Sequence, residues 1–321
     1  MGVIGRWAEC QEVDRLLRRE RLVAVTGPGG AGKSALAGEV VRRLAWQPRP
    51  QVRLVDFAAL ADPALVPRWL GYTLRGCRGG RRPVVLVVET CDRVAGATVE
   101  TLAEMVREEP LLHALMTSRI PVDAPARVRL DPLPFDEILR IFHLSAPRRV
   151  DEGAEPVREI CELLDGLPLA AQAAARRLGR SSAEELLALL SRPERALELG
   201  NGPEHGPERH RTLGDSLRWS LRLCTPGQRL LWARCSVFPG SFTLRDAQVV
   251  CTDERLGAEA AERAFEGLRL HQLLIGGGPA VRLPRDVRTY GRQRLSALGE
   301  EQEFQRRCLQ WSLRPYAEVA D

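Results

Sequence analysis

Lysine is almost absent from this 321-residue chain. Of its 47 basic residues, only Lys33 is a lysine, and all the others are arginines. The two side chains are not equivalent, because lysine ends in a compact ammonium group and arginine in a planar guanidinium group. We attribute the excess of arginine to a GC-rich genome, so the one position that keeps lysine is the informative one.

Long apolar runs and clustered cysteines are also missing. The longest strong apolar run, residues 84–88, is far shorter than the roughly 20 residues that cross a bilayer. Residues 1–6 contain neither the apolar core of a signal peptide nor the hydroxyl that N-myristoylation needs. The eight cysteines form no C-x-x-C pair and no cluster with histidine, which argues against a zinc site or a disulfide framework. We therefore expect a cytoplasmic protein without a membrane partner, with reduced and mostly buried thiols.

The net charge of +5 does not by itself indicate a nucleic-acid-binding protein. Acidic residues are interleaved with arginines along nearly the whole chain, which favours a solvated surface over a basic patch. Hydrophobic residues make up 44% of the chain and charged residues 28%, as in ordinary globular proteins. A chain of this length is expected to fold as two or three domains.

The one lysine stands at the end of a glycine-rich segment. Residues 22–26 predict a short buried strand, and apolar residues at helical spacing predict a helix from residue 33 to residue 46. The segment between them, G-P-G-G-A-G-K-S, matches the phosphate-binding loop G-x-x-x-x-G-K-[ST] in the strand–loop–helix context that this site requires. A chance glycine turn before a helix is the alternative, and both flanks argue against it.

Each part of this loop has a role in binding phosphate. The glycines let backbone N–H groups curl around a β-phosphate, and the helix N-terminus adds its positive end. Lys33 should reach the β- and γ-phosphates, and the Ser34 hydroxyl should ligate Mg²⁺. The predicted nucleotide-binding residues of the loop are Gly27, Pro28, Gly29, Gly30, Ala31, Gly32, Lys33, Ser34 and Ala35.

A second apolar strand ends in a carboxylate. Residues 84–88 predict a buried strand, and Glu89 follows directly. This is the Walker B arrangement, in which a carboxylate at the C-terminal end of the strand meets the Mg²⁺ shell. Glu89 is therefore a candidate metal ligand. It could instead be a catalytic base that does not bind metal, and Asp92 is another candidate acid.

An arginine ends a further predicted strand. Residues 112–117 lead into Ser118 and Arg119. Because the C-terminal ends of parallel strands converge on the ligand, we favour a role for Arg119 at a γ-phosphate over a surface salt bridge. The rest of this α/β pattern comprises two strands, two helices and a closing linker, at 52–57, 127–130, 68–74, 98–108 and 131–134.

Beyond residue 134 the pattern becomes mostly helical. Amphipathic helices are predicted at 137–144, 155–164, 169–178 and 181–190, and Pro168 fixes the backbone angle φ at the start of one of them. A glycine- and proline-rich stretch near residues 200–207 is a linker. A third unit follows from about residue 210. It contains helices at 213–223, 226–235, 244–251 and 258–270, then two short strand candidates at 273–275 and 280–283, and this order suggests a winged helix.

The order of these motifs resembles the STAND ATPases that carry an NB-ARC module, especially bacterial transcriptional regulators of the antibiotic-regulatory and LuxR types. The segments that carry the resemblance span nearly the whole chain. They are Ile4-Gly5-Arg6, the phosphate-binding loop, residues 84–92, Thr117-Ser118-Arg119, Gly166-Leu-Pro-Leu-Ala170, Arg211-Thr-Leu213 with Trp219-Ser220, Ser236-Val-Phe-Pro-Gly240 and Val287-Arg-Thr-Tyr290.

The resemblance implies a fold, an order of domains and a set of ligands. The fold is an α/β P-loop NTPase with an ASCE-type parallel sheet, followed by a helical bundle and a winged helix. An N-terminal segment that lines the base side precedes the nucleotide-binding domain, and the start of a helical region ends the chain. The corresponding ranges are 1–20, 21–133, 134–200, a linker at 201–208, 209–295 and 296–321. The implied ligands are ADP or ATP with Mg²⁺.

The resemblance also implies roles for single residues. Ile4, Gly5 and Arg6 line the base side, Pro168 contacts the adenine, and Arg119 senses the γ-phosphate. Arg285 and Asp286 stand where the related MHD motif has histidine and aspartate, in a turn that holds ADP and keeps the molecule closed. Two plainer readings stay open: Asp286 as the N-cap of a helix at 287–295, and Arg285 as a surface residue.

The chain departs from the family at three points. Relatives usually have Asp-Asn where this chain has Glu89-Thr90, and Mg²⁺ demands strict geometry, so we expect slow ATP hydrolysis at most. The sequence Pro284-Arg285 alters the run before Val287. Relatives usually continue into helical repeats and carry a DNA-binding domain, so we expect effector or sensor domains outside this chain.

We therefore expect a signalling switch that acts in transcription, closed with ADP and open for self-association with ATP. A ligand shifts such an equilibrium only through its different affinities for the two states. Sequence-specific DNA binding through residues 210–295 is the alternative, with Arg285, Arg288, Arg292 and Arg294 as candidate contacts. We do not expect it, because a charged solvent-facing helix explains these arginines better. A metabolic P-loop kinase is a third possibility, and the winged-helix pattern argues against it.

Overall fold

The computed structural model describes residues 3–77, 81–147, 151, 153–200, 211–276 and 278–317. The chain divides into two compact units, Met1–Leu133 and Pro134–Asp321. The predicted linker at 201–208 lies outside the described residues.

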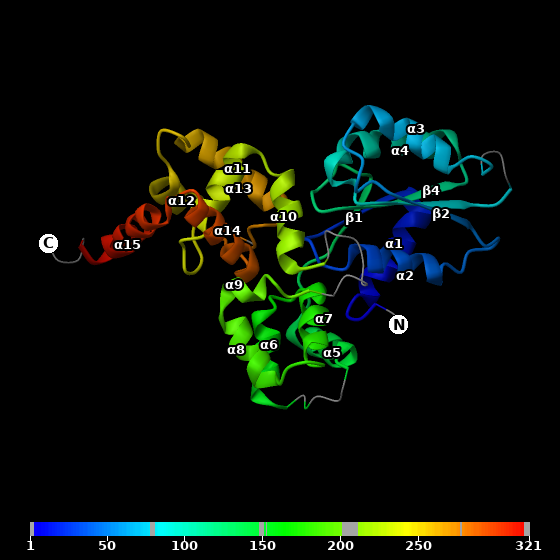
Figure 1. Cartoon of the computed structure of the whole chain (residues 1–321). Coiled ribbons are helices and arrows are strands. Elements are labelled where there is room, and N and C mark those ends of the chain that lie inside the picture. The colour runs from blue at the N-terminus through cyan, green and yellow to red at the C-terminus, as the bar shows by residue number, and fades with distance from the viewer. Residues whose placement is uncertain are drawn as a thin grey trace. The chain divides into compact units, whose positions relative to one another are not determined.

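The first unit is a parallel sheet covered by helices on both faces (Figure 1). Its elements are α1 (Trp7–Glu20), β1 (Leu22–Thr26), α2 (Lys33–Arg43), β2 (Gln51–Asp56), η1 (Pro63–Leu65), α3 (Val66–Thr73), β3 (Val84–Glu89), η2 (Cys91–Arg93), α4 (Ala95–Glu108), β4 (Leu112–Ser118) and β5 (Ala126–Arg129). Every strand and helix predicted for this part of the chain is present, with ends that differ by a few residues.

The five strands are all parallel and lie in the order β2-β3-β4-β1-β5. Strand β4 therefore separates β1 from β3, which is the ASCE-type arrangement, and the prediction of a P-loop NTPase fold is confirmed. Thr26 of β1 pairs with Ser118 of β4, and Val88 of β3 pairs with Met116 of β4. This register brings the carboxyl ends of β1, β4 and β3 to one edge of the sheet.

Both faces of the sheet are buried along its central strands, β1, β3 and β4. Val23 and Val25 of β1 belong to the same core as Leu36 of α2, whereas Ala24 belongs to the core on the other face, with Leu102 of α4. Burying an aliphatic side chain of this size contributes about 1.5–3 kcal/mol. Because both faces are covered, these strands are continuous apolar runs, which is why they could be recognised in the sequence.

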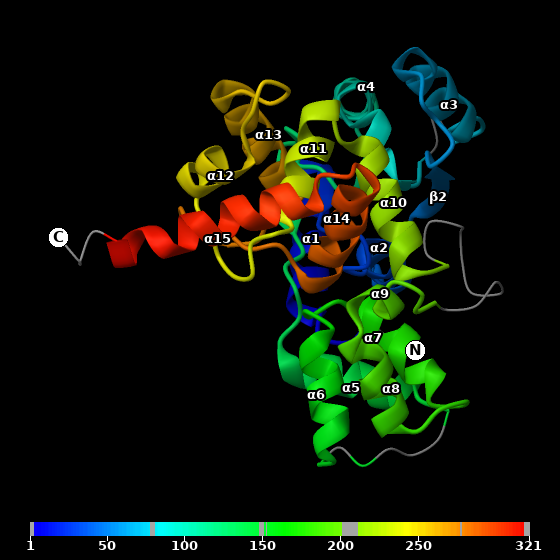
Figure 2. The ribbon, with the colours of Figure 1, turned by 60° about the vertical axis from the view of Figure 1, so that its left-hand side comes forward.

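The second unit is almost wholly helical (Figure 2). We call residues 134–200 the helical bundle and residues 211–317 the C-terminal subdomain. The bundle contains α5 (Phe135–Ser145), α6 (Glu155–Leu163), α7 (Pro168–Arg177), α8 (Ala183–Ser191) and α9 (Pro193–Ala196). The subdomain contains α10 (Leu213–Leu223), α11 (Pro226–Cys235), α12 (Leu244–Cys251), α13 (Ala258–Leu270), α14 (Arg285–Ala297) and α15 (Glu301–Ala317). The four-residue α9 was not predicted, because it is too short to show a helical period.

The two strand candidates between residues 273 and 283 form only isolated bridges. Ile275 pairs with Arg282, and Phe242 pairs with Val281, each through two N–H···O bonds of 2.8–2.9 Å. Val281 and Arg282 are adjacent in one segment, but they pair with two different segments, one on each side. The result is a minimal three-segment antiparallel arrangement, whereas the sequence predicted only two short strands here.

Arg234 of α11 is fully buried in the C-terminal subdomain. Its guanidinium group donates to both carboxylate oxygens of Asp253 at 2.6 and 2.8 Å, to Glu300 at 3.1 Å and to the Cys251 carbonyl at 2.9 Å. It also stacks over the Phe304 ring at 4.3 Å. Burial lowers the pKa of Arg234, but the carboxylate bonds outweigh burial and raise it, and the same bonds lower the pKa of Asp253. This network joins α11 to the α12–α13 loop and to the start of α15.

Candidate functional site

The glycine-rich loop joins the end of β1 to the start of α2. Gly32 has a φ of 93°, a left-handed conformation that strains any residue with a side chain. A Cβ on Gly27 would lie 3.0 Å from the carbonyl oxygen of Leu130, so only glycine lets the loop pass the end of β5 without a shift. Lys33 Nζ donates to the carbonyl oxygens of Gly27 and Pro28 at 2.7 and 2.9 Å. The ammonium group is therefore held over the start of the loop.

This arrangement fits a bound phosphate. The first N–H groups of α2 have no partner within the helix, and the helix N-terminus carries a partial positive charge of about 0.5. Ser34 and Ala35, in the first turn of α2, are exposed. The backbone donors, the Lys33 ammonium group and the Ser34 hydroxyl thus belong to one short segment, and their chemistry matches an anion with a coordinated metal.

Glu89 is the last residue of β3 and is half-buried. Neighbouring strands lie about 4.8 Å apart, so with β4 between them β3 and β1 are about 10 Å apart. A partly hydrated Mg²⁺, held by one or two carboxylates and by phosphate oxygens, suits such a gap. In the described part of the chain, no three His, Cys, Asp or Glu side chains cluster as a metal cage.

The turn after Glu89 is strained and anchored. Thr90 has a φ of 55°, and its N–H donates to the Thr117 hydroxyl of β4 at 3.1 Å. A β-branched residue in this conformation is an outlier that costs about 1–3 kcal/mol, whereas asparagine tolerates it. Asparagine is the residue that the resembled family usually has here. Thr90 is therefore less suited to this turn than asparagine would be.

Asp92 and Arg119 form a buried pair. Asp92 Oδ1 accepts the backbone N–H of Arg119 at 2.6 Å, and Asp92 Oδ2 lies 3.8 Å from Arg119 Nε. Both residues are 5% exposed. The pairing joins the η2 turn, after β3, to the end of β4, so the plainer reading of Arg119 as a member of a surface salt bridge does not hold.

Arg6 is also buried, and it contacts the phosphate-binding loop. Its guanidinium group donates to the carbonyl oxygen of Asp131 at 2.6 Å and of Ala31 at 3.5 Å, and it pairs with Glu9 at 2.8 Å. It therefore ties the start of α1 to the loop and to the residues after β5. Ile4 and Gly5 lie in the turn just before it and are half-buried.

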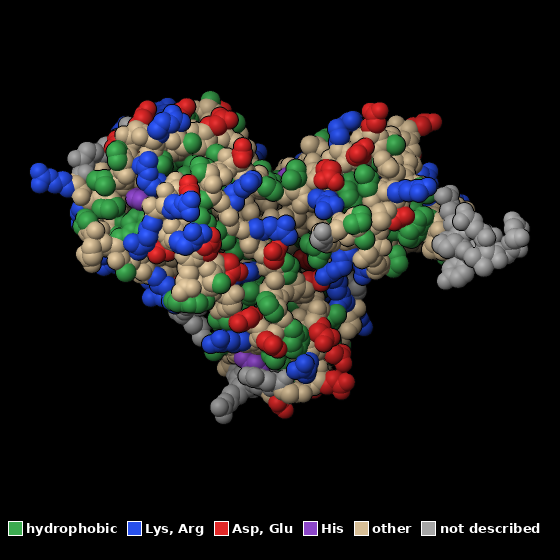
Figure 3. Space-filling view, turned by 180° about the vertical axis from the view of Figure 1, so that it is seen from behind, with side chains coloured by type: hydrophobic (Ala, Val, Ile, Leu, Met, Phe, Trp, Pro, Cys, Tyr) green, Lys and Arg blue, Asp and Glu red, His purple; other side chains and the backbone are tan. Residues whose placement is uncertain are grey.

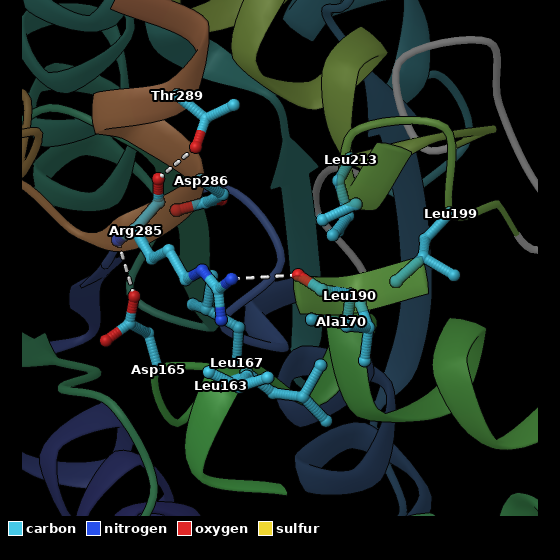
Figure 4. A pocket seen from close by; sticks show the side chains of 12 residues that line it. Leu163, Asp165, Leu167, Ala170, Leu190, Leu199, Leu213, Arg285, Asp286 and Thr289 are labelled. Carbon is cyan, nitrogen blue, oxygen red and sulfur yellow. Dashed lines mark hydrogen bonds between the residues drawn. The ribbon is translucent and has the colours of Figure 1, made fainter. Parts of the chain in front are cut away.

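In the second unit, one carboxylate joins the helical bundle to the C-terminal subdomain (Figure 4). Asp165, just after α6, accepts the backbone N–H of Arg285 at 2.6 Å and pairs with the side chain of Arg282 at 3.2 Å. The Arg285 guanidinium group donates to the carbonyl oxygen of Leu190 in α8 at 2.8 Å. Arg285 is thus engaged within its own unit and is not a plain surface residue.

The predicted N-cap role of Asp286 is wrong. Helix α14 begins at Arg285, after Pro284, so Asp286 is its second residue, and its Oδ1 accepts the N–H of Val287 at 2.8 Å. The helix's first N–H group is satisfied by Asp165 instead. Burial, and then the nearby Asp165 carboxylate, raise the pKa of Asp286 to about 6.

Arg285 and Asp286 line a small cavity inside the second unit. It has a volume of about 20 Å³, room for about one water molecule, and its other walls are mostly leucines, among them Leu167 and Leu199. Pro168 begins α7, as predicted, next to this cavity wall. The structure thus brings the Gly166–Ala170 segment close to Arg285 and Asp286.

Asp165 is the site residue that sequence reasoning missed. It has a φ of 49°, and Gly166 after it has a φ of 71°. An Asp-Gly dipeptide is a turn signal, and it stands directly before the Gly166–Ala170 segment, so it marked the turn. No local pattern connected the turn to Arg285, which is 120 residues away.

None of the helices in the described part of the chain combines the length and the apolar character that crossing a lipid bilayer requires.

No protein-family model matches this chain. Uncharacterized protein Rv0894 of Mycobacterium tuberculosis is 32% identical to it over 330 residues, which cover 92% of this chain and 82% of that protein. A longer M. tuberculosis protein, provisionally named HTH-type transcriptional regulator Rv0890c, is 28% identical over 312 residues, covering 89% of this chain and 35% of that protein. Among solved structures, the Walker-type ATPase PABY2304 of Pyrococcus abyssi has a TM-score of 0.61 at 13% identity, covering 90% of this chain and 96% of that chain.

Proposed function

Because this chain belongs to the family of the uncharacterized mycobacterial protein Rv0894, whose name gives no activity, its role must be inferred from its own residues, and we propose that it is a switch controlled by ADP and ATP. The observation that carries the proposal is the phosphate-binding loop at the carboxyl end of β1, with Lys33 held over it. Phosphate binding by this loop also explains why lysine, and not arginine, stands at position 33.

The loop residues would bind the β-phosphate, and Lys33 would bind the β- and γ-phosphates. Ser34 and Glu89 would hold Mg²⁺, which when bound neutralises phosphate charge and orients the phosphate oxygens. Glu89 lies at the same edge of the sheet as the loop, which supports this pairing. Arg6 would act indirectly, since it donates a hydrogen bond to the carbonyl oxygen of Ala31 in the loop.

Arg119 would sense the γ-phosphate, and Asp92 would position it. The Asp92 carboxylate is committed to the backbone and guanidinium group of Arg119, which makes Asp92 a poor candidate for a general acid. A buried arginine whose backbone is fixed by a carboxylate from the neighbouring strand end is pre-organised toward the sheet edge. Such a group stabilises phosphate charge without further ordering.

The second unit would provide the moving part. The bridges of Phe242 and Ile275 around α12 and α13 support the winged-helix reading of the C-terminal subdomain. The resemblance to STAND proteins implies that Pro168, Arg285 and Asp286 face the nucleotide in the closed, ADP-bound state. We call the turn at Arg285 and Asp286 the latch, because it would hold ADP and keep the molecule closed. The bonds of Arg285 to Leu190 and Asp165 support this role, because they make the position of α14 depend on the position of the bundle.

We propose that the switch acts in transcription, through domains outside this chain. The relation to a longer protein with the name of an HTH-type transcriptional regulator supports this proposal. In the ATP state, the opened molecule would self-associate, and hydrolysis would be slow.

Direct sequence-specific DNA binding, the second candidate, finds less support. Of its candidate contacts, Arg285 donates to Leu190, Arg288 donates to the Pro239 carbonyl, and Arg292 pairs with Glu301. On the face seen in Figure 3, basic and acidic side chains are interspersed. Helix α13, the fourth helix of the proposed winged-helix unit, exposes Glu259, Glu262 and Glu266 beside Arg263, so its exposed side chains are mainly acidic and DNA phosphates would repel them.

Two measurements test the proposed switch. The nucleotide that co-purifies is released by denaturation and identified by chromatography and mass spectrometry, and we expect ADP. A protein that carries no nucleotide and gives no signal on calorimetric titration with ADP would contradict nucleotide binding. Small-angle scattering with ADP and with ATP then tests the switch itself. We expect a larger radius or mass with ATP, and identical profiles would leave a nucleotide-binding protein that is not a switch.

A further inference from the structure

A groove on the C-terminal subdomain is lined by the end of α10, by α11, by the α12–α13 loop and by the last turn of α14. These helices are labelled in Figure 2. Its volume is about 380 Å³, and small-molecule sites span about 300–1,000 Å³. It lies at the opposite end of α14 from Arg285 and Asp286. None of the residues considered above for nucleotide binding lines it.

The walls of this groove are apolar, and its charged groups are all basic. Leucine side chains from three elements, Leu221, Leu230 and Leu298, form much of the surface. The charged residues that line it are Arg229, Arg255 and Arg294, and no carboxylate joins them. A groove of one charge sign with apolar walls favours an anion that also has an apolar body.

The three arginines differ in how far their charge is compensated. Arg255 pairs with Glu300, which also binds Arg234. Arg229 donates to the carbonyl oxygens of Leu221 and Arg222 at 2.9 and 3.3 Å. These neutral acceptors orient its guanidinium group but do not neutralise its positive charge. Arg294 is exposed in the last turn of α14 and forms no ion pair among the described residues. Two positive charges thus remain for a ligand.

We propose that this groove binds a small organic anion, a carboxylate, sulfonate or phosphate ester with an aromatic or branched aliphatic body. Arg229 and Arg294 would pair with the anionic group, and the leucines would cover the body. Arg229 is already fixed by its bonds to the end of α10, which reduces the entropy lost on binding. The proposal does not depend on nucleotide binding, because the groove belongs to the second unit alone.

The plainer reading is that Arg294 only stabilises the negative end of α14. Two fluorescent probes separate the readings. 8-Anilinonaphthalene-1-sulfonate carries a sulfonate on an apolar ring system, and N-phenyl-1-naphthylamine has the same rings without the charge. We expect the sulfonate to bind the full chain at one site, and the neutral probe to bind at least tenfold more weakly.

Variants locate the binding. Arg294→Gln should weaken sulfonate binding at least fivefold, whereas Arg245→Gln, which changes an exposed arginine on α12, should leave it unchanged. Lys33→Ala should also leave it unchanged. Equal affinity for both probes, unchanged binding by Arg294→Gln, or loss of the sulfonate in Lys33→Ala would each overturn the proposal. The last outcome would place the probe in the nucleotide loop instead, without bearing on the proposed switch.

Discussion

Asp165 Oδ2 accepts a hydrogen bond of 2.6 Å from the backbone N–H of Arg285, across 120 residues of sequence. A side chain of the helical bundle thus caps the first helical N–H of α14 in the C-terminal subdomain. The same carboxylate pairs with Arg282, and it adds to burial in raising the pKa of Asp286. Asp165 therefore caps the first turn of α14 and also influences the charge of Asp286 in that turn.

Replacing Asp165 should loosen this connection. Asp165→Ala removes a capping acceptor and an ion pair, and we expect the free energy of unfolding to fall by about 1–2 kcal/mol. Asp165→Asn keeps an acceptor for the Arg285 N–H and should lose less than half of that. Denaturant unfolding with Asp123→Ala as a control, an exposed aspartate of the first unit, checks the order. Equal stability of Asp165→Ala and the control would contradict it.

Arg285→Ala should separate the latch from a merely structural contact. The substitution removes the bond to the Leu190 carbonyl but keeps the backbone N–H that Asp165 accepts. We expect stability to change by less than about 1.5 kcal/mol, the usual net worth of one hydrogen bond. As a latch residue, its loss should weaken ADP binding and increase expansion or self-association with ATP. Scattering profiles and ADP affinity identical to those of the wild type would rule the latch out.

Asp286→Asn should remove a pH dependence of stability. The folded pKa of about 6 lies above the ordinary 3.8, so between these values the folded protein holds a proton that the unfolded chain releases. The contribution of this group to stability is therefore greatest at low pH and falls as the pH rises through about 6. The stability of the variant minus that of the wild type, measured by thermal unfolding, should therefore be larger at a pH near 7.5 than at a pH near 5. A constant difference between variant and wild type would contradict this.

Lys33→Ala should abolish nucleotide binding and leave the fold intact. The ammonium group lies over the loop, bonded to two backbone carbonyls, and its loss removes the main positive charge there. We expect ADP affinity to fall at least about tenfold, or 1.4 kcal/mol. Lys33→Arg should not restore it, because a planar group does not replace a compact ammonium group among phosphate oxygens. Calorimetric titration measures both, and wild-type affinity in Lys33→Ala would contradict the proposed site.

ATP hydrolysis should be slow. Glu89 is the only acid at the end of β3, and Asp92 is bound to Arg119. We expect a single-turnover rate well below the ordinary enzyme range of about 1 to 10³ per second. Glu89→Gln should reduce it further without loss of ADP binding. A wild-type rate within the ordinary range would show that glutamate serves this site well.

Arg234→Met should destabilise the C-terminal subdomain strongly. It leaves Asp253 and Glu300 without their buried partner, and breaking such a pair costs about 3–5 kcal/mol. Because both carboxylates are partly exposed, we expect the lower end of this range. The pKa of Asp253 is lower in the folded protein than in the unfolded chain, so this group stabilises the fold at pH values above its ordinary pKa. That contribution to stability is lost as the pH falls through the pKa of the folded state. Arg245→Met is the exposed control, and equal melting temperatures for the two variants would contradict the prediction.

The sequence alone determined the first unit. Its central strands β1, β3 and β4 are buried on both faces, so they stand out as apolar runs, and its phosphate-binding loop is one continuous segment of eight residues. Local backbone geometry, helix start and side-chain chemistry coincide there, and no distant residue is needed to recognise them. Helix α9 is too short to show a period, and the bridge of Val281 joins it to Phe242, far away in the sequence, so neither could be predicted in the same way.

The tertiary structure decided which residues pair. The sequence placed Asp92 and Arg119 at two strand ends, but only the insertion of β4 beside β3 brought them together. It offered Asp286 as one candidate for the cap of α14, whereas folding delivers Asp165 from the turn after α6. Periodicity records which face of an element is buried. It does not record which distant side chain completes a hydrogen bond, because that depends on the packing of whole elements.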